Sequence, residues 1–293
     1  MRNLGDACRT AGGRSRTIAG CPGAVLPDRL STGDLASQLS SRVGGGPFLY
    51  HEEVTSTNAE ARSLAIGGAC EGTVVIAESQ TAGRGRLGRH WSSPPGQGLL
   101  FSVVLRPQLP MSDVHLLTLV VACAVARAIE AMAGVPIDIK WPNDLYFCHR
   151  KVGGILLEIG GTQDVVDWVV AGIGINVNTE LSELPATLSQ TAGSLKSASG
   201  TAIDRTELLA RILLQLDVEY TAALVFGFAS ALDGFRDRDY LLGRDVSVQT
   251  KDGPVPGRAA GINEYGALIL RLPKEQVRCF HAGDVSLRAG PCD

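Results

Sequence analysis

Apolar runs of strand length and of helix length follow one another along the chain from Phe48 onward. Short runs rich in β-branched residues predict strands, which are Phe48–Glu53, Thr73–Glu78, Leu99–Leu105, Ile137–Trp141, Val152–Ile159 and Val165–Ile175. Runs with helical spacing predict helices, which are Ser31–Val43, Ala59–Ile66, Ser112–Ala133, Ile203–Leu224 and Phe226–Asp239. Because a Gly160-Gly161 turn separates the last two strands, we expect them to pair in a mixed sheet. The pattern therefore predicts an α+β domain.

The texture of the sequence changes after Tyr240. Short apolar runs alternate there with turns rich in glycine, proline and asparagine, which is typical of a small β-barrel. Its expected strands are Asp245–Gln249, Arg258–Ile262, Ala267–Leu272, Gln276–Phe280 and Asp284–Arg288. We therefore expect one domain over residues 28–239 and a second, all-β domain over residues 240–293.

Two shorter patterns concern the helix ends and the N-terminus. Asp204 and Glu207 have the spacing of a helix N-cap and its reciprocal partner. Residues 1–27 are rich in arginine, poor in acidic residues and lack hydrophobic periodicity, so we expect a disordered leader. A start codon assigned too far upstream fits equally well, and a transit peptide fits less well because no amphipathic helix is apparent.

Composition and charge narrow the class of protein. The net charge of −3 gives no global basic footprint for nucleic acid, and the single helix expected before Phe48 cannot form a helix-turn-helix module. The seven cysteines are odd in number and form no C-x-x-C, which favours a reducing, cytoplasmic location. The run Leu116–Ala126 is too short to span a bilayer, so no membrane partner is expected.

The stretch Thr81–Trp91 (TAGRGRLGRHW) is the most unusual part of the chain. Its arginines would repel one another unless an anion lay between them, and its glycines let the backbone approach a ligand closely. It formally contains G-x-G-x-x-G, but Pro94-Pro95-Gly96 follows where a dinucleotide fingerprint needs a helix. We therefore interpret the stretch as a mobile loop that closes on an anion.

Four other stretches concentrate polar residues at strand ends. Thr55-Ser56-Thr57-Asn58 suits helix capping, which composition favours, or a polar ligand group. Lys140-Trp141-Pro142-Asn143-Asp144 suits a turn or, equally, a phosphate and its Mg²⁺. The paired glycines of the Lys151–Glu158 stretch (KVGGILLE) suggest that something lies against that strand. The stretch Gly172–Asn178 (GIGINVN) includes an asparagine, Asn176, that could hydrogen-bond a base or ribose.

The chain resembles biotin protein ligase (biotin–acetyl-CoA-carboxylase ligase) from about Phe48 to Arg288. The resemblance rests on the order of its motifs, which are TSTN and Gln80, then GRGRLGRHW, KWPND, KVGGILLE and GIGINVN. The resemblance implies a mixed-sheet catalytic domain followed by an SH3-like barrel. It also implies two steps, in which biotin and ATP give biotinyl-5′-AMP and the biotin then passes to a lysine of biotin carboxyl carrier protein. The chain looks like the short class without an N-terminal DNA-binding domain, acting as a monomer or homodimer.

The resemblance also implies roles for individual residues. Lys151, Arg84 and Arg86 would be catalytic. The residues expected at biotin are Ser56, Thr57, Asn58, Gln80, Arg84, Gly85, Arg86, Lys151, Gly153 and Gly154. Those expected at ATP are Arg86, Arg89, Trp91, Lys140, Asn143 and Asn176, with Mg²⁺ near Asp144.

Two rival functions remain. Lipoate–protein ligase shares the fold and the acyl-adenylate chemistry, but a dithiolane ring offers no ureido groups to Ser56, Thr57 and Gln80. A ligand-sensing regulator is disfavoured by the acidic charge balance.

Overall fold

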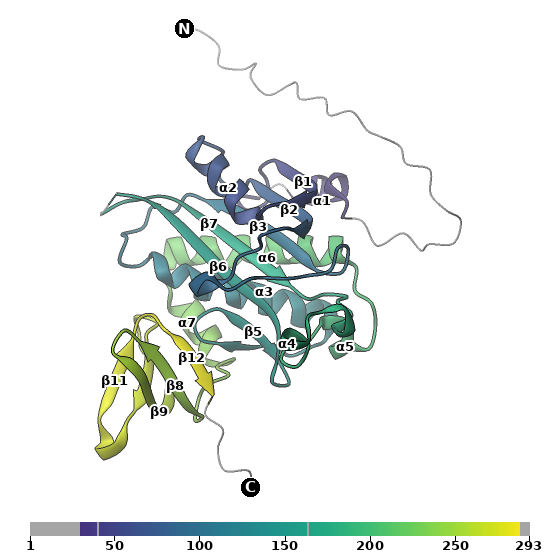
Figure 1. The fold of residues 1–293 in the computed structure, drawn as a ribbon. Helices are drawn as coiled ribbons and strands as arrows, with labels where there is room; N and C mark the ends of the chain where they lie inside the picture. The colour runs from purple at the N-terminus through teal and green to yellow at the C-terminus, as the bar shows by residue number, and fades with distance from the viewer. Residues whose placement is uncertain (1–29, 40, 163, 288–293) are drawn as a thin grey trace.

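The computed structural model describes residues 30–39, 41–162 and 164–287. The expected leader over residues 1–27 lies outside them. A seven-stranded sheet with the order β1-β2-β3-β7-β6-β5-β4 forms the centre of the molecule (Figure 1). Its strands are β1 (Phe48–Val54), β2 (Val74–Gln80), β3 (Leu99–Leu105), β4 (Asp138–Lys140), β5 (Asp144–Phe147), β6 (Arg150–Gly161) and β7 (Val166–Ile175). Strands β1 and β2 are parallel and all other neighbours are antiparallel, so the prediction of a mixed sheet is confirmed.

Helices cover both faces of the sheet. They are α1 (Thr32–Gln38), α2 (Thr57–Ile66), α3 (Leu117–Ala133), α4 (Ala186–Ser189), α5 (Leu195–Ser199), α6 (Arg205–Phe226) and α7 (Ala229–Arg236). Short 3₁₀ turns are η1 (Arg86–Gly88), η2 (Val114–Leu116), η3 (Leu181–Glu183) and η4 (Pro273–Glu275). Figure 1 shows α3 and α6 together across one side of the sheet, with α2 near β1 and β2.

The alternation of β3 explains these two layers. Leu99, Phe101 and Val103 belong to the large hydrophobic core that includes α3 and α6, whereas Val104 belongs to a small core with Ala61 of α2. Successive side chains of a strand point to opposite faces. Both cores are therefore specified by one strand that is apolar on each face.

The structure corrects several predicted element boundaries. The expected turn at Gly160-Gly161 lies inside β6, and beyond it the Thr162 amide donates to the Val165 carbonyl at 3.0 Å. The expected capping box is only half formed, because Asp204 accepts a hydrogen bond from the Glu207 amide at 2.9 Å whereas the Glu207 carboxylate binds Arg211. Strand β5 and the segment with η3, α4 and α5 were not predicted.

The most apolar helix is a core element. Residues Val114–Ala133 are long and apolar enough to cross a membrane by length and composition, yet 67% of their most apolar window is buried inside the fold. Helix α3 begins at Leu117, later than predicted, because η2 precedes it.

A five-stranded antiparallel sheet forms the C-terminal domain, with the order β11-β10-β9-β8-β12. Its strands are β8 (Asp245–Thr250), β9 (Gly253–Ile262), β10 (Leu268–Arg271), β11 (Val277–Phe280) and β12 (Asp284–Leu287). Trp141 anchors it to the larger domain, because the indole Nε1 donates to the Gly266 carbonyl at 3.0 Å. The molecule is therefore α+β with a small SH3-like domain, as the sequence predicted.

Candidate active site

A pocket of about 350 Å³ lies on the α2 side of the central sheet. Glycines of β6 and β7 form part of its wall, because Gly154, Gly172 and Gly174 carry no side chains there. A Cβ atom at Gly172 would come within 1.8 Å of the Asn58 side chain, and one at Gly174 within 2.6 Å of the Trp91 ring. The glycines thus let Asn58 and Trp91 lie directly against the strands, which accounts for the alternation of glycine and isoleucine in β7.

One end of the pocket is built where α2 begins. Ser56 is the N-cap residue of α2, but its side chain makes no capping bond. Instead the side chain of Gln80 caps the helix, since its Oε1 accepts from the Thr57 amide at 2.8 Å. The predicted cap position in TSTN is therefore confirmed at Ser56, but the capping bond comes from Gln80, and Ser56 and Thr57 line the pocket.

Asn58 is held by the sheet beneath this end. Its amide donates to the Leu156 carbonyl at 3.2 Å and to Glu158 at 3.1 Å, and its Oδ1 lies 2.7 Å from the Ser102 hydroxyl. These bonds fix Asn58 as a support for the neighbouring pocket wall, although it also lines the pocket.

The glycine–arginine loop (residues 81–98) joins β2 to β3 and covers the pocket. It is folded on itself, because Gly85 donates its amide to the Arg89 carbonyl at 2.8 Å and Arg84 forms a bridge with His90. Leu87 and Gly88 adopt positive φ angles of 56° and 74° at its tip. The loop therefore places its arginines around a tight turn.

Arg86 is the most enclosed of these arginines. Its guanidinium donates to Asn143 Oδ1 and to the Gly283 carbonyl, each at 3.2 Å. Burial lowers the pKa of Arg86, and the carboxylates of Asp144 and Asp284 oppose that change. Arg86 thus links the loop, the β4–β5 turn and the C-terminal domain at one point.

A second link joins the loop to the C-terminal domain. Arg89 forms an ion pair with Asp284, the first residue of β12. Asp284 and Val285 line the pocket together with the loop. The pocket is therefore shared between the two domains.

Lys151 and Asp144, which both line the pocket, form an ion pair with Nζ 2.6 Å from Oδ1. The ammonium also lies 5.6 Å from the centre of the Trp91 ring. Strands β5 and β6 set this geometry, since Asp144 is registered with Gly154. The predicted turn in KWPND is confirmed, because the Asn143 backbone amide donates to the Lys140 carbonyl at 3.1 Å. Asn143 and Asp144 also line the pocket, and their role toward phosphate and Mg²⁺ stays a prediction.

Lys140 adds a further cation to the same wall. Burial lowers the pKa of Lys140, and the nearby carboxylates of Asp144 and Asp284 partly offset this effect. A lysine that burial makes costly to keep charged gains from any anion that enters the pocket.

Two polar atoms near Trp91 lack partners among the described residues. They are the Trp91 Nε1, a donor, and the Asn176 Oδ1, an acceptor, and both are buried. Asn176 is held through its amide nitrogen, which donates to the Gly193 carbonyl at 3.0 Å. Unpaired buried polar groups are costly, so this end of the pocket suits a ligand with complementary hydrogen-bonding groups.

The structure brings together every predicted site residue except Gly153. The Cβ position of Gly153 faces the Gly174 carbonyl and the Leu145 side chain, and Gly153 is not among the residues that line the pocket. Sequence reasoning missed further lining residues, which are Tyr146, Leu184, Leu188, Thr191, Ala192, Asp284 and Val285. Their local sequences carry no motif, and only chain topology brings them here.

Comparison with known proteins decides the family. Residues 50–176 match the model of the biotin/lipoate A/B protein ligase family, and residues 241–288 match that of the biotin protein ligase C-terminal domain. The bifunctional ligase/repressor BirA of Bacillus subtilis is 37% identical over 89% of this chain and 80% of that protein. The chain belongs to the biotin protein ligase family.

Other members of the family agree in sequence and structure. The biotin–[acetyl-CoA-carboxylase] ligase of Paracoccus denitrificans is 37% identical over 74% of this chain and 91% of that protein. The biotin protein ligase from Aquifex aeolicus, solved in complex with biotin and ATP, has a TM-score of 0.72 and 31% identity. That match covers 82% of this chain and 98% of the Aquifex chain.

Proposed function

We propose that the pocket joins biotin to ATP as biotinyl-5′-AMP and then passes the biotin to a lysine of a carrier protein. Membership of the family makes the chain an ATP-dependent biotin–protein ligase. The observation that supports this pocket as the site of the reaction is its set of positively charged side chains, namely Arg84, Arg86, Arg89, Lys140 and Lys151. A carboxylate and a triphosphate repel each other, and such a set can hold them in contact.

The end of the pocket at α2 is proposed to bind the ureido ring of biotin. Ser56, Thr57 and Gln80 line this end and offer both donors and acceptors. Asn58, bonded to the sheet, would support that wall rather than reach the ligand. Gly85 and Gly154 line the same pocket, and Gly154 leaves the space beside Lys151, whereas Gly153 faces away from it.

The end of the pocket at Trp91 is proposed to bind adenosine. The unpartnered Oδ1 of Asn176 would accept from the nucleoside, and Trp91 would contact the base. Leu184 and Leu188 line the same pocket and would enclose the apolar surface of the base.

Lys151 is proposed to act in both steps. In the first, an oxygen of the biotin carboxylate bonds to the α-phosphorus, the bond to the β-phosphate oxygen breaks, and pyrophosphate leaves. In the second, the amine nitrogen of the carrier's lysine bonds to the acyl carbon, the bond from that carbon to the phosphate oxygen breaks, AMP leaves, and the nitrogen gives up one proton to solvent. The Lys151 ammonium would neutralise the α-phosphate and carboxylate, while Arg84 and Arg86 would close on them.

Mg²⁺ is proposed to enter with ATP. The described residues contain no cluster of three or more His, Cys, Asp or Glu that could hold a metal alone. Asp144 fits the manner in which Mg²⁺ is bound by one or two carboxylates together with phosphate oxygens. Asp144 would then share its carboxylate between the metal and Lys151.

The carrier is proposed to be the biotin carboxyl carrier of a biotin-dependent carboxylase, as the name of the Paracoccus relative suggests. The proposed place of action is the cytoplasm, with no nucleic-acid or membrane partner. We place the boundary between the catalytic domain and the SH3-like domain near Tyr240. Lipoate ligase is not favoured, because the Paracoccus and Aquifex relatives, which match 74% and 82% of this chain, are biotin ligases.

Exchange of labelled pyrophosphate into ATP tests the proposal. We expect exchange by the full chain to depend on biotin and to be absent with lipoate. Exchange with lipoate alone would overturn the assignment of the substrate. Exchange with neither acid would overturn the first step.

A further inference from the structure

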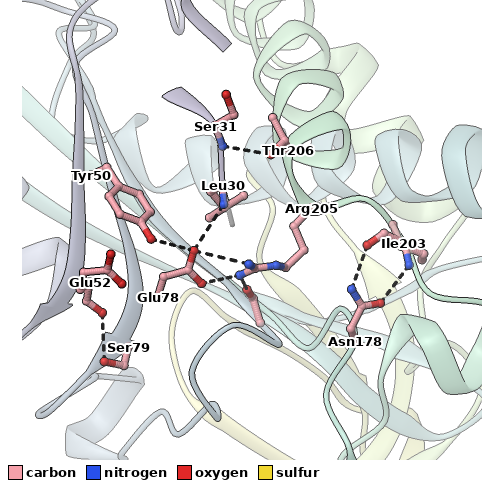
Figure 2. Close-up of polar contacts among 11 residues, drawn as sticks. Leu30, Ser31, Tyr50, Glu52, Glu78, Ser79, Asn178, Ile203, Arg205 and Thr206 are labelled. Atoms are coloured by element: carbon pink, nitrogen blue, oxygen red, sulfur yellow. Dashed lines mark hydrogen bonds and ion pairs between the residues drawn. The ribbon is translucent and has the colours of Figure 1, made fainter. Parts of the chain in front are cut away.

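A buried arginine, Arg205, lies behind the pocket at the start of α6. Its side chain is fully buried, and its guanidinium binds Glu78, whose side chain is 8% exposed. The NH1 group donates to Glu78 Oε2 at 2.6 Å and to the Gly98 carbonyl at 3.0 Å, and the NH2 group donates to Glu78 Oε1 at 3.4 Å. Figure 2 shows Glu78 pointing toward Arg205, with Tyr50 and Leu30 converging on the same carboxylate.

The contacts of Arg205 lie where strands β2 and β3 stop pairing. Strands β2 and β3 are registered only as far as Ala77 and Leu100. Beyond that pair the strands separate, and the glycine–arginine loop begins after Gln80 and ends at Gly98. Arg205 therefore bridges the fork between the two strands, because it binds the Glu78 carboxylate on one side and the Gly98 carbonyl on the other.

A second route links α6 to the same fork. Asn178 exchanges two hydrogen bonds with Ile203, two residues before Arg205, at 2.8 and 2.9 Å. The backbone N–H of Asn178 also donates to the Gln97 carbonyl at 2.8 Å. The last two residues of the loop, Gln97 and Gly98, are thus both tied to the beginning of α6.

We propose that Arg205 is a positioning residue for the ligase reaction, which fixes the separation of the two ends of the glycine–arginine loop. A loop closes over a ligand reproducibly only if its ends are fixed, because each free end multiplies the conformations that closure must remove. Arg205 is not among the residues that line the pocket. Its effect passes through Glu78, two residues before Gln80, and through Gly98.

The expected effect of Arg205 on the reaction rests on the proposed function, whereas its anchoring of the loop ends does not. A loop with loosened ends would release biotinyl-5′-AMP before transfer. Independently of any activity, it would expose the bonds after Arg84, Arg86 and Arg89 to trypsin. Proteolysis therefore tests the inference even if the proposed reaction were wrong.

A second guanidinium in the chain provides a matched control. Arg238 binds Glu130 through two hydrogen bonds of 2.7 and 3.1 Å and donates to the Gly234 carbonyl at 3.1 Å. It repeats the pattern of a bidentate carboxylate and one carbonyl, but none of its contacts lies in the loop. Substitution of either arginine should lower the stability of the whole fold, but only substitution of Arg205 should loosen the ends of the loop.

The experiment compares Arg205→Lys with Arg238→Lys in the full chain. Trypsin cleavage within the loop is measured at the same interval below each variant's unfolding midpoint, with and without biotin and ATP. We expect Arg205→Lys to raise the rate of loop cleavage about tenfold over Arg238→Lys, which corresponds to about 1.4 kcal/mol of local opening. Equal rates in the two variants would overturn the proposal and leave Arg205 a purely structural residue.

Turnover gives the second readout. Arg205→Lys should release more adenylate per transfer than Arg238→Lys, with most of the change in KM for biotin rather than in kcat. If Arg205→Lys does not fold, Glu78→Asp is compared with Glu130→Asp, since each keeps its charge and shortens the carboxylate arm. Indistinguishable loop cleavage in that pair would equally overturn the proposal.

Discussion

The ammonium of Lys151 lies 2.6 Å from the carboxylate of Asp144, across the paired strands β5 and β6. The Lys151 side chain is 32% exposed and that of Asp144 is 18% exposed, so the pair remains open to the pocket. Ion pairs with this degree of exposure contribute little to stability, about 0–1 kcal/mol. The pair is better explained by the chemistry of the pocket than by the stability of the sheet.

Replacing Lys151 with alanine should therefore abolish adenylate formation while the fold survives. The reason is that the variant loses the charge proposed to bridge carboxylate and α-phosphate but loses little buried surface. Biotin-dependent pyrophosphate exchange measures the first effect and thermal unfolding the second. Lys196→Ala, which removes another partly exposed ion pair, is the control. Normal exchange in Lys151→Ala would remove Lys151 from the mechanism.

Replacing Arg86 with glycine should release the adenylate early. The variant cuts the loop from both Asn143 and Gly283 at once. Freed biotinyl-5′-AMP would label lysines on any protein nearby, which can be followed with bovine serum albumin as a bystander. Arg271→Gly, an exposed position in β10, controls for the change of residue type. Labelling confined to the carrier would show that Arg86 does not retain the intermediate.

Replacing Asp284 with asparagine should weaken ATP binding. The ion pair with Arg89 joins the C-terminal domain to the loop, and its loss should raise KM for ATP by a factor of about five, equivalent to about 1 kcal/mol. Steady-state kinetics at varied ATP measure this change. Asp252→Asn, in the exposed turn between β8 and β9, should leave KM unchanged. An unchanged KM in Asp284→Asn would contradict the prediction and show that the ion pair between Arg89 and Asp284 does not affect ATP binding.

Replacing Gly174 with alanine should displace Trp91. The new methyl group would come within 2.6 Å of the indole, and overpacking of this kind costs about 1–3 kcal/mol. We expect weaker ATP binding by calorimetry together with a changed tryptophan fluorescence. Gly33→Ala, where no atom lies within 4 Å of the added carbon, is the control. Wild-type ATP affinity would mean that the indole position is unimportant for the nucleotide.

ATP binding should weaken at alkaline pH through Lys140. Burial lowers the pKa of Lys140 below its ordinary 10.5, so between the two values the folded protein holds fewer protons than the unfolded chain. Stability therefore rises with pH across that window. An anion in the pocket favours the ammonium form, so ATP affinity should fall as pH rises through the lowered pKa.

The slope and a variant test this assignment. Above the lowered pKa the affinity should fall by up to about tenfold per pH unit, as measured by calorimetry. Lys140→Arg should remove the fall, whereas Lys251→Arg, at an exposed turn, should keep it. A pH profile that is the same in Lys140→Arg would exclude Lys140 as its source.

The sequence by itself determined most of the long helices and strands and the polar stretches that form much of the pocket wall, but not β5 or the segment with η3, α4 and α5. The continuous apolar run of β3 and the alternating glycines of β7 are local signals, because a strand exposes successive residues to opposite faces. The arginines of the loop and the charged residues of the KWPND stretch also indicated, from composition alone, a site that binds charged ligands. Their common ligand came from resemblance, since each motif alone had an ordinary structural explanation.

Tertiary structure decided what no local pattern encodes. Gln80 caps α2 from 23 residues away, Asp284 reaches the loop from the second domain, and Arg205 joins strands that precede it by more than 100 residues. A hydrogen bond depends on the distance between two atoms in space, whereas a motif records only their spacing along the chain. These long-range contacts therefore appear only once the sheet and both domains are assembled.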